Sequence, residues 1–292
     1  CRRVAGDLDA NLYLAEQKLP RACQTPRLMV KFFYNHRSLG KKEKTQHTAH
    51  EEWRKQSVRV LAVGCHPDDL EIGCGGTLNK YVENGAEVFM CHVANGNLGH
   101  VEIPPAKLAV IRAAEAERAG EIIGATKVFS LDVGDSYVTE FDEAVVDQMT
   151  DVIREVRPDL IITHSDVDYM RDHVQVNRLV FNASFMSGIV QRRTTHPAFA
   201  PIVPIYYMDT LAGVGFEPTH YVDISGNIEV KLTALAAHDS QIAWMREHDN
   251  IDFLDFVRTC SRYRGYQCGV PFAEAFTTCR TWPRPDARNL LP

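Results

Sequence analysis

The 292-residue sequence has no apolar run of the roughly 18 residues that a membrane-spanning helix needs. Its first residues, 1–6, form no apolar segment like the core of a secretory signal. None of the eight cysteines belongs to a Cys-x-x-Cys pair, so free thiols are favoured over a disulfide framework. These absences lead us to expect a cytoplasmic protein without a membrane span.

The sequence also lacks a strong excess of charge, because 32 Lys and Arg stand against 38 Asp and Glu. Residues 1–57 depart from this balance, with 12 basic and 6 acidic side chains. The basic residues there are scattered among few aromatics, which favours a solvated extension over a nucleic-acid-binding arm. The acidic remainder argues against nucleic acid as a partner. We expect a loosely ordered extension at 1–57, a single domain at 58–280 and a tail at 281–292.

Strand and helix signals alternate from residue 57 onward, without an internal repeat. The expected strands are 58–63, 87–93, 127–131, 159–163, 204–209 and 221–224. The expected helices are 77–84, 106–123, 143–156, 173–189, 228–237 and 241–263. Strands separated by crossover helices indicate an α/β fold, namely a three-layer, Rossmann-like, mostly parallel sheet with helices on both faces.

Two polar clusters directly follow two of these apolar strands. The first, residues 64–71, contains His-Pro-Asp-Asp and follows strand 58–63. The second, residues 164–173, is rich in His and Asp and follows strand 159–163. Because the carboxyl ends of parallel strands meet at the same edge of a sheet, the two clusters predict the two halves of one metal site.

The spacing within the clusters suggests individual ligands. His66 and Asp69 are three residues apart on a turn restricted by Pro67, so both could converge on one ion. Asp68, between them, would remain free as a base, and His173 is the best candidate for a third ligand. Such ligands suit Zn²⁺ and tolerate Fe²⁺ or Co²⁺. The alternative is that the two aspartates cap a helix, but the second cluster favours the metal.

A set of segments extends this pattern over residues 59–276. The set comprises His-Pro-Asp-Asp after the first strand, an Asp-His that opens a later helix, Asn95-Gly96, Arg112, Glu115, and residues 221–225, 238–241, 262–265 and 273–276. Together these segments resemble the PIG-L/LmbE family of zinc-dependent N-deacetylases. The resemblance implies a hydrolase that removes an N-acetyl group from an N-acetylglucosamine-type amino sugar or its conjugate. It also implies a homo-oligomer, either a trimer or a hexamer.

The resemblance assigns roles to individual residues. It implies that His66, Asp69 and His173 hold one Zn²⁺ per chain, and that Asp68 is the general base for attack of the metal-bound water. Arg112 matches a family arginine that binds substrate oxygens, although it could instead form a salt bridge near Glu115. Asp172 is expected to orient the site through hydrogen bonds.

One position departs from the family pattern. Many relatives have a histidine three residues before the third ligand, where this chain has Met170, which cannot donate a proton. The residues that could supply the missing function are Asp168, Tyr169, His164 and His238.

Two other functions compete with hydrolysis. Met170 suggests a non-catalytic sugar- or metabolite-binding descendant of the fold, whereas the retained Asp68 argues against it. Residues 70–76 resemble the first motif of S-adenosylmethionine-dependent methyltransferases, but the strand ends before them and Thr77 replaces the third alternating glycine. We expect these glycines instead to let the backbone pass close to the ligand crevice and to start a helix tightly against the sheet.

Overall fold

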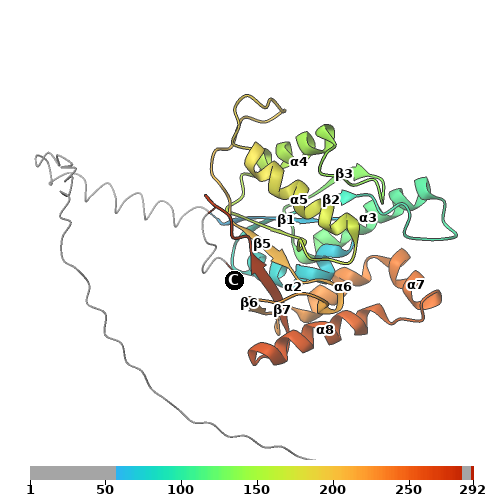
Figure 1. The fold of residues 1–292 in the computed structure, drawn as a ribbon. Helices are drawn as coiled ribbons and strands as arrows, with labels where there is room; N and C mark the ends of the chain where they lie inside the picture. The colour runs from blue at the N-terminus through green and yellow to red at the C-terminus, as the bar shows by residue number, and fades with distance from the viewer. Residues whose placement is uncertain (1–56, 285–290) are drawn as a thin grey trace, which may run out of the picture. The chain divides into compact units, whose positions relative to one another are not determined.

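The computed structural model describes residues 57–284 and 291–292, which contain a seven-stranded sheet flanked by helices (Figure 1). The predicted N-terminal extension therefore lies outside the described residues except for Ser57. The strands are β1 (Arg59–Gly64), β2 (Glu87–Ala94), β3 (Lys127–Val133), β4 (Leu160–Thr163), β5 (Ile205–Met208), β6 (His220–Asp223) and β7 (Ala273–Thr278). The helices are α2 (Asp69–Glu83), α3 (Pro105–Ile123), α4 (Glu143–Val156), α5 (Arg171–Met186), the 3₁₀ turn η1 (Leu211–Gly213), α6 (Ile228–Ala236), α7 (Asp239–Glu247) and α8 (Phe253–Cys268).

The strand order of the sheet is β3-β2-β1-β4-β5-β7-β6. Strands β1 to β5 run parallel, whereas β7 is antiparallel to both β5 and β6. The chain order reverses at β1, which has β2 on one side and β4 on the other. Open α/β sheets bind ligands outside the carboxyl ends of the strands at such a point. The predicted α/β fold, with a mostly parallel sheet and helices on both faces, is confirmed.

Successive residues of the central strands pack into opposite layers. On β1, Val60 and Ala62 join a core with α2, α6 and α8, whereas Leu61 and Val63 join a core with α4 and α5. All four side chains are fully buried. A strand that is buried on both faces needs an uninterrupted apolar run, which is the pattern that predicted this strand.

Helix α2 begins at Asp69, so the prediction of a helix start near residue 77 is wrong. The glycines in question lie inside the helix, where they allow close packing. A Cβ at Gly73 would lie 2.6 Å from the sulfur of Met208, and one at Gly76 would lie 2.9 Å from Ile224. The expected close backbone approach is therefore present, but within the helix. A helical Gly73–Gly76 segment does not form the glycine loop of a methyltransferase.

A buried ion pair contacts the middle of α2. Glu274 of β7 accepts hydrogen bonds from the backbone N–H groups of Gly76 (3.0 Å) and Thr77 (2.7 Å). Lys231 of α6 donates to Glu274 and to the carbonyl of Ile72 (2.7 Å). The two charged side chains are 1% and 3% exposed, so their contacts replace the water that they lose on folding.

The C-terminal third differs most from expectation. The single helix expected at 241–263 is two helices, α7 and α8, because Asp252 ends the intervening loop and caps α8 by accepting a hydrogen bond from the N–H of Asp255. Strand β7 was not predicted. In the expected C-terminal tail, Arg284 donates a hydrogen bond of 2.8 Å to Ser184. Among residues 57–284, no helix is long and apolar enough to cross a membrane.

Candidate metal centre and active site

The carboxyl edge of the sheet opens into a cavity of about 510 Å³. This volume is within the range of small-molecule sites in proteins. Both predicted clusters contribute to its wall, through His66, Asp68, Asp69, His164, Asp168, Asp172 and His173, and Arg112 joins them from α3. The fold therefore brings together seven of the eight residues that the sequence singled out, along with His164.

Asp69 lies at the centre of this group. Its Oδ2 accepts hydrogen bonds from the backbone N–H groups of Cys65 (3.1 Å) and His66 (2.6 Å), which fixes the turn before α2. Its Oδ1 faces Nε2 of His173 at 3.3 Å. No side chain caps the start of α2, so the alternative that the two aspartates cap a helix is wrong. Asp69 instead uses Oδ2 to hold the preceding turn and directs Oδ1 at His173.

The imidazole of His173 has a defined orientation. Its Nδ1 lies 3.1 Å from Oδ2 of Asp168, and because a carboxylate can only accept, Nδ1 carries the hydrogen. Within the described part of the chain, the buried Nε2 has no hydrogen-bond partner. Burial lowers the pKa of His173, but Asp69 and Asp168 outweigh it and raise the pKa to about 9. The space between Nε2 and Asp69 therefore attracts a cation, and its donors are ones that divalent metals prefer.

His66 approaches Asp69 from the turn after β1. Its Nδ1 lies 3.5 Å from Oδ2 of Asp69, and its Nε2 lies 3.6 Å from Oδ2 of Asp172. The rings of His66 and His173 are 5.5 Å apart between centroids. Two imidazoles on one tetrahedral ion are separated by about 5 Å at ordinary zinc–nitrogen distances. Each imidazole thus has one nitrogen toward Asp69 and the other toward an orienting carboxylate, Asp168 or Asp172.

His164 joins the cluster, although the sequence suggested it only as a substitute for the absent family histidine. Its ring stacks on His173 with centroids 4.0 Å apart. Its Nε2 accepts a 2.9 Å hydrogen bond from the N–H of Cys65. Burial and the neighbouring His173 lower the pKa of His164 to about 4, which agrees with an unprotonated Nε2. The signal for His164 is its position directly after the last residue of β4.

Two groups of three residues have all their ligand atoms within 4.8 Å of one another in the described part of the chain. They are Cys65–His66–Asp69 and Asp69–His164–His173. The predicted trio of His66, Asp69 and His173 is therefore divided between two groups that share Asp69.

Asp68 does not join these groups and instead forms an ion pair with Arg112. Nη2 of Arg112 lies 3.0 Å from Oδ2 of Asp68 and donates to the carbonyl of Pro67, while Nη1 donates to the carbonyl of Gly96. The backbone of Asp68 has φ 134°, a value that non-glycine residues rarely adopt and that is concentrated at functional sites. Burial raises the pKa of Asp68, and the charge of Arg112 opposes this rise.

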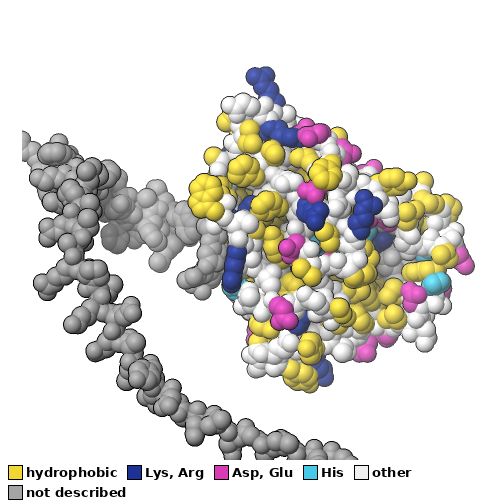
Figure 2. All heavy atoms as spheres, viewed as in Figure 1, with side chains coloured by type: hydrophobic (Ala, Val, Ile, Leu, Met, Phe, Trp, Pro, Cys, Tyr) yellow, Lys and Arg dark blue, Asp and Glu magenta, His cyan; other side chains and the backbone are white. Residues whose placement is uncertain are grey.

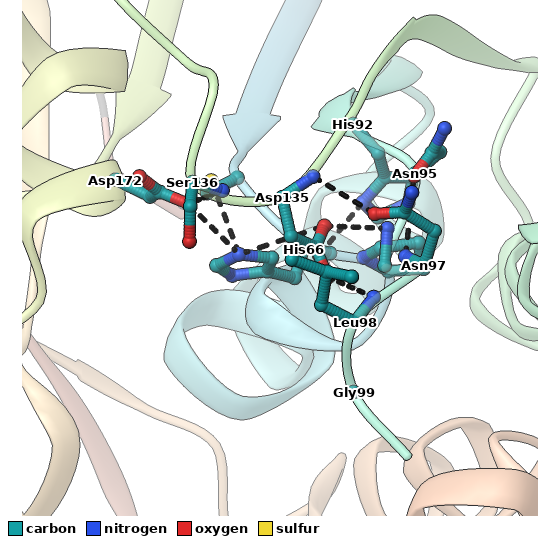
Figure 3. A network of polar contacts seen from close by, with 12 residues as sticks. His66, His92, Asn95, Asn97, Leu98, Gly99, Asp135, Ser136 and Asp172 are labelled. Atoms are coloured by element: carbon teal, nitrogen blue, oxygen red, sulfur yellow. Dashed lines mark hydrogen bonds and ion pairs between the residues drawn. The ribbon is translucent and has the colours of Figure 1, made fainter. Parts of the chain in front are cut away.

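Asp135 fixes the loop that contacts Arg112, and it was not among the residues singled out from the sequence (Figure 3). Its two carboxylate oxygens accept hydrogen bonds from the N–H groups of Gly96 (2.8 Å) and Leu98 (2.9 Å). Its own N–H donates to the side chain of Asn97 (3.0 Å). The only available signal is that Asp135 follows β3, a third parallel strand whose carboxyl end reaches the same edge.

Glu115 does not pair with Arg112. Its carboxylate accepts hydrogen bonds from the N–H (2.8 Å) and the hydroxyl (2.7 Å) of Ser240, at the start of α7. The contact places α7 against α3, and the next residue, Gln241, lines the cavity.

The four candidates for the role of the absent histidine have different surroundings. His238 is fully buried and lies 3.4 Å from Glu71, away from the cavity wall. The carboxylate of Asp168 already accepts a hydrogen bond from Nδ1 of His173, the third predicted ligand. Tyr169 and His164 both line the cavity beside that ligand.

The chain is similar to proteins of known activity. The family model for PIG-L, described as GlcNAc-PI de-N-acetylase, matches residues 61–184. The chain is 30% identical over 228 residues to the diacetylchitobiose deacetylase of Thermococcus kodakarensis, covering 74% of this chain and 81% of that protein. It is 28% identical over 245 residues to a 1D-myo-inositol 2-acetamido-2-deoxy-alpha-D-glucopyranoside deacetylase of Streptomyces griseus, covering 63% and 75% respectively.

A solved structure shares the fold. The N,N'-diacetylchitobiose deacetylase from Pyrococcus horikoshii, in complex with an inhibitor, superposes with a TM-score of 0.67 at 23% identity. The match covers 84% of this chain and 95% of that chain. The family resemblance inferred from the sequence is confirmed by these comparisons.

Proposed function

The chain belongs to the PIG-L family of de-N-acetylases, and from this premise we propose that it is a metal-dependent hydrolase of N-acetylglucosamine-type amino sugars or their conjugates. The two relatives named above are deacetylases of diacetylchitobiose and of an inositol-linked 2-acetamido sugar. One observation carries the proposal: a buried Nε2 of His173, unpartnered among the described residues, faces a carboxylate oxygen of Asp69. Asp68 stands beside this pair as a separate carboxylate.

Asp69, His66 and His173 are the residues that would hold one ion per chain. Their nitrogen and oxygen donors suit Zn²⁺ and tolerate Fe²⁺ or Co²⁺. Bound there, Zn²⁺ would supply a Lewis acid that polarises the amide carbonyl and lowers the pKa of a water molecule. Asp168 and Asp172 would keep the two imidazoles turned toward Asp69.

Asp68 is the group that moves protons. Its carboxylate lines the cavity and takes a proton from the attacking water, then delivers it to the nitrogen of the departing amine. The bond that breaks is the amide C–N bond, and the products are a carboxylic acid and a free amine. Arg112 fixes the position of Asp68, and from the cavity wall it binds substrate oxygens.

The chain would act as a cytoplasmic homo-oligomer, a trimer or hexamer. All six cysteines within the described residues are free, as expected in a reducing compartment. Hydrophobic side chains are spread over the face of the domain seen in Figure 2. Tyr137 and Phe141 are 78% and 81% exposed, and apolar surface of this kind is available for burial between subunits. Analytical ultracentrifugation of the full chain gives the assembly size.

The substitution Asp68→Asn tests the proposal, because it preserves the shape of the side chain but removes its capacity to take a proton. We expect the variant to keep its zinc and to lose about 10²- to 10⁴-fold in turnover. Metal analysis and amine release from N-acetylglucosamine and diacetylchitobiose measure the two effects. The control is Asp166→Asn, at an exposed carboxylate outside the cavity wall, which should change neither.

Two outcomes would count against the proposal. Unchanged turnover in Asp68→Asn would remove Asp68 from the role of base. Stoichiometric zinc without turnover of any N-acyl substrate by the unaltered protein would indicate a binding protein with the same fold.

A further inference from the structure

The cavity changes from polar to apolar within one helical turn of the proposed metal ligands. On α2, Asp69 lines the polar part, and Ile72 and Gly73 line the apolar part. On α7, Gln241 is followed four residues later by Met245. Residues three or four apart share a helix face, and one turn advances by about 5 Å. Both helices therefore present the same polar-to-apolar order to the cavity.

The apolar part is a packed surface of the fold. Met208 at the end of β5 is 1% exposed, Phe253 at the start of α8 is 7% exposed, and Leu211 of η1 lies beside them in the wall. Gly73 leaves room for this surface, since a Cβ there would lie 2.6 Å from the sulfur of Met208. With Ile72 of α2 and Met245 of α7, five separate elements thus contribute apolar side chains to the cavity wall.

The charged residue at this end of the cavity is neutralised. Asp209 follows Met208 and binds the guanidinium of Arg264 through both carboxylate oxygens, at 2.9 Å for the Nη2–Oδ1 pair. Its Oδ1 also accepts the N–H of Thr210 (2.9 Å). A ligand in the apolar part therefore meets no unpaired carboxylate there.

Hydrogen bonds to residues outside the apolar part hold α7 in place in the cavity wall. Glu115 binds the first turn of α7 through Ser240, and Nε2 of Gln241 donates to the carbonyl of Gly99 (3.3 Å). These contacts fix the helix that carries Met245. A preformed apolar surface next to a reaction centre is typical of a subsite for an apolar ligand group.

We propose that the natural substrate carries an apolar group of several carbons, which is either its acyl chain or its aglycone. The residues that would hold this group are Ile72, Met208, Leu211, Met245 and Phe253. The inference rests on the proposed hydrolase function and names the substrate class of the same site. The methyl of an acetyl group lies one bond from the carbonyl carbon and does not span a helical turn, whereas a longer chain does. Burial of that chain removes apolar surface from water.

The test compares two substrate series on the zinc-loaded protein. One series lengthens the acyl group of N-acylglucosamine from acetyl to butyryl and hexanoyl. The other keeps the acetyl group and lengthens a β-glycoside from methyl to butyl and hexyl. We expect kcat/KM in one series to rise about threefold to fourfold per buried methylene, and at least about tenfold overall. The series that rises identifies whether the apolar group is the acyl chain or the aglycone.

Two variants of Met245 test the subsite directly. Met245→Gln keeps the length of the side chain but introduces a polar amide, whereas Met245→Leu remains apolar. We expect the Gln variant to lose about tenfold in preference for the long substrate and the Leu variant to keep it. Val110→Gln, at a 71% exposed position of α3, is the surface control, and thermal melting shows that each variant is folded. Equal losses in the two Met245 variants would contradict the proposal.

Failure of this proposal is distinguishable from failure of the hydrolase function. Flat or falling kcat/KM in both series, with N-acetylglucosamine still hydrolysed, would overturn the subsite alone. If no amide is hydrolysed, the proposed function fails, and calorimetry with hexanoate and hexyl β-D-glucosaminide still decides the subsite. Binding of one of these at least tenfold tighter than its short homologue, lost in Met245→Gln, supports the proposal, and equal binding overturns it.

Discussion

Helix α2 contacts two buried charged clusters of opposite character. In the middle of the helix, Lys231 and Glu274 bind each other and three backbone groups. At its start, Nε2 of His173 has no hydrogen-bond partner among the described residues and faces Oδ1 of Asp69 at 3.3 Å, and Asp68 has a strained backbone. Unpaired buried groups cost about 1–3 kcal/mol each, so proteins usually avoid them. The paired cluster stabilises the helix, whereas the unpaired cluster is suited to a ligand.

This comparison predicts different responses to substitution. Loss of a member of the paired cluster should lower stability, since the remaining charge stays buried without a partner. Loss of a member of the unpaired cluster should lower metal binding and activity much more than stability, because functional sites are commonly strained in the absence of their ligand.

The largest expected effect is that of His173→Ala. We expect metal content well below one ion per chain and a loss of at least about a thousandfold in turnover, because the Lewis acid is no longer held. The free energy of unfolding of the metal-free protein should change less than in the Lys231 variant below. Metal analysis, amine release and urea unfolding in a chelator measure these quantities. A variant with full metal content would show that His164, and not His173, completes the site.

The second effect, on stability, is that of Lys231→Met. The change leaves the carboxylate of Glu274 buried without its cation, and we expect a loss of about 3–5 kcal/mol in the free energy of unfolding. Adding Glu274→Gln removes the stranded charge and should recover part of the loss. Urea unfolding of the metal-free proteins gives both values. A loss below about 1 kcal/mol in the free energy of unfolding of Lys231→Met would contradict the view that the paired cluster serves stability.

The smallest expected effect is on activity at Gly96. A comparison of Gly96→Ala with Gly85→Ala separates the cost of backbone strain from the effect on the geometry of the site. Gly96 and Gly85 have similar positive φ values, 73° and 83°, so alanine at either position should cost about 1–2 kcal/mol. A Cβ at Gly96 would lie 2.6 Å from the side chain of Arg112, whereas one at Gly85 meets nothing within 4 Å. We expect only Gly96→Ala to displace Arg112 and to lower kcat/KM, by about tenfold. Equal activities in the two variants would show that Asp68 does not depend on this contact.

The elements whose own residues define them were predictable from the sequence. Helix α4 occupies 143–156 as expected, because Asp142 caps it by accepting the N–H of Ala144 (2.9 Å) and Arg157-Pro158 ends it. The start of α2 was not predictable in this way. Its glycines resemble a loop in sequence, and only the nearness of Met208 and Ile224, far along the chain, shows why a helix needs them.

The candidate site shows the same division. The position of two polar clusters after parallel strands was enough to predict that His66, Asp69 and His173 would approach one another. His164 and Asp135 could not be weighed correctly, because their roles depend on a ring stack and a loop contact that spacing does not reveal. Strand β7 was missed because it pairs antiparallel with β5 and β6. The alternation of strands and crossover helices, which predicted the parallel strands, therefore does not indicate it.

The hydrogen bonds from α2 to Glu274 also bear on when the site can form during synthesis of the chain. His66, Asp69 and His173 all lie within residues 61–184, whereas Lys231 and Glu274 follow much later in the chain. A polypeptide leaving the ribosome therefore exposes every proposed ligand before it contains the strand that secures the helix beneath them. We therefore expect α2 to be held in place beneath the proposed ligands only after Glu274 has been synthesised.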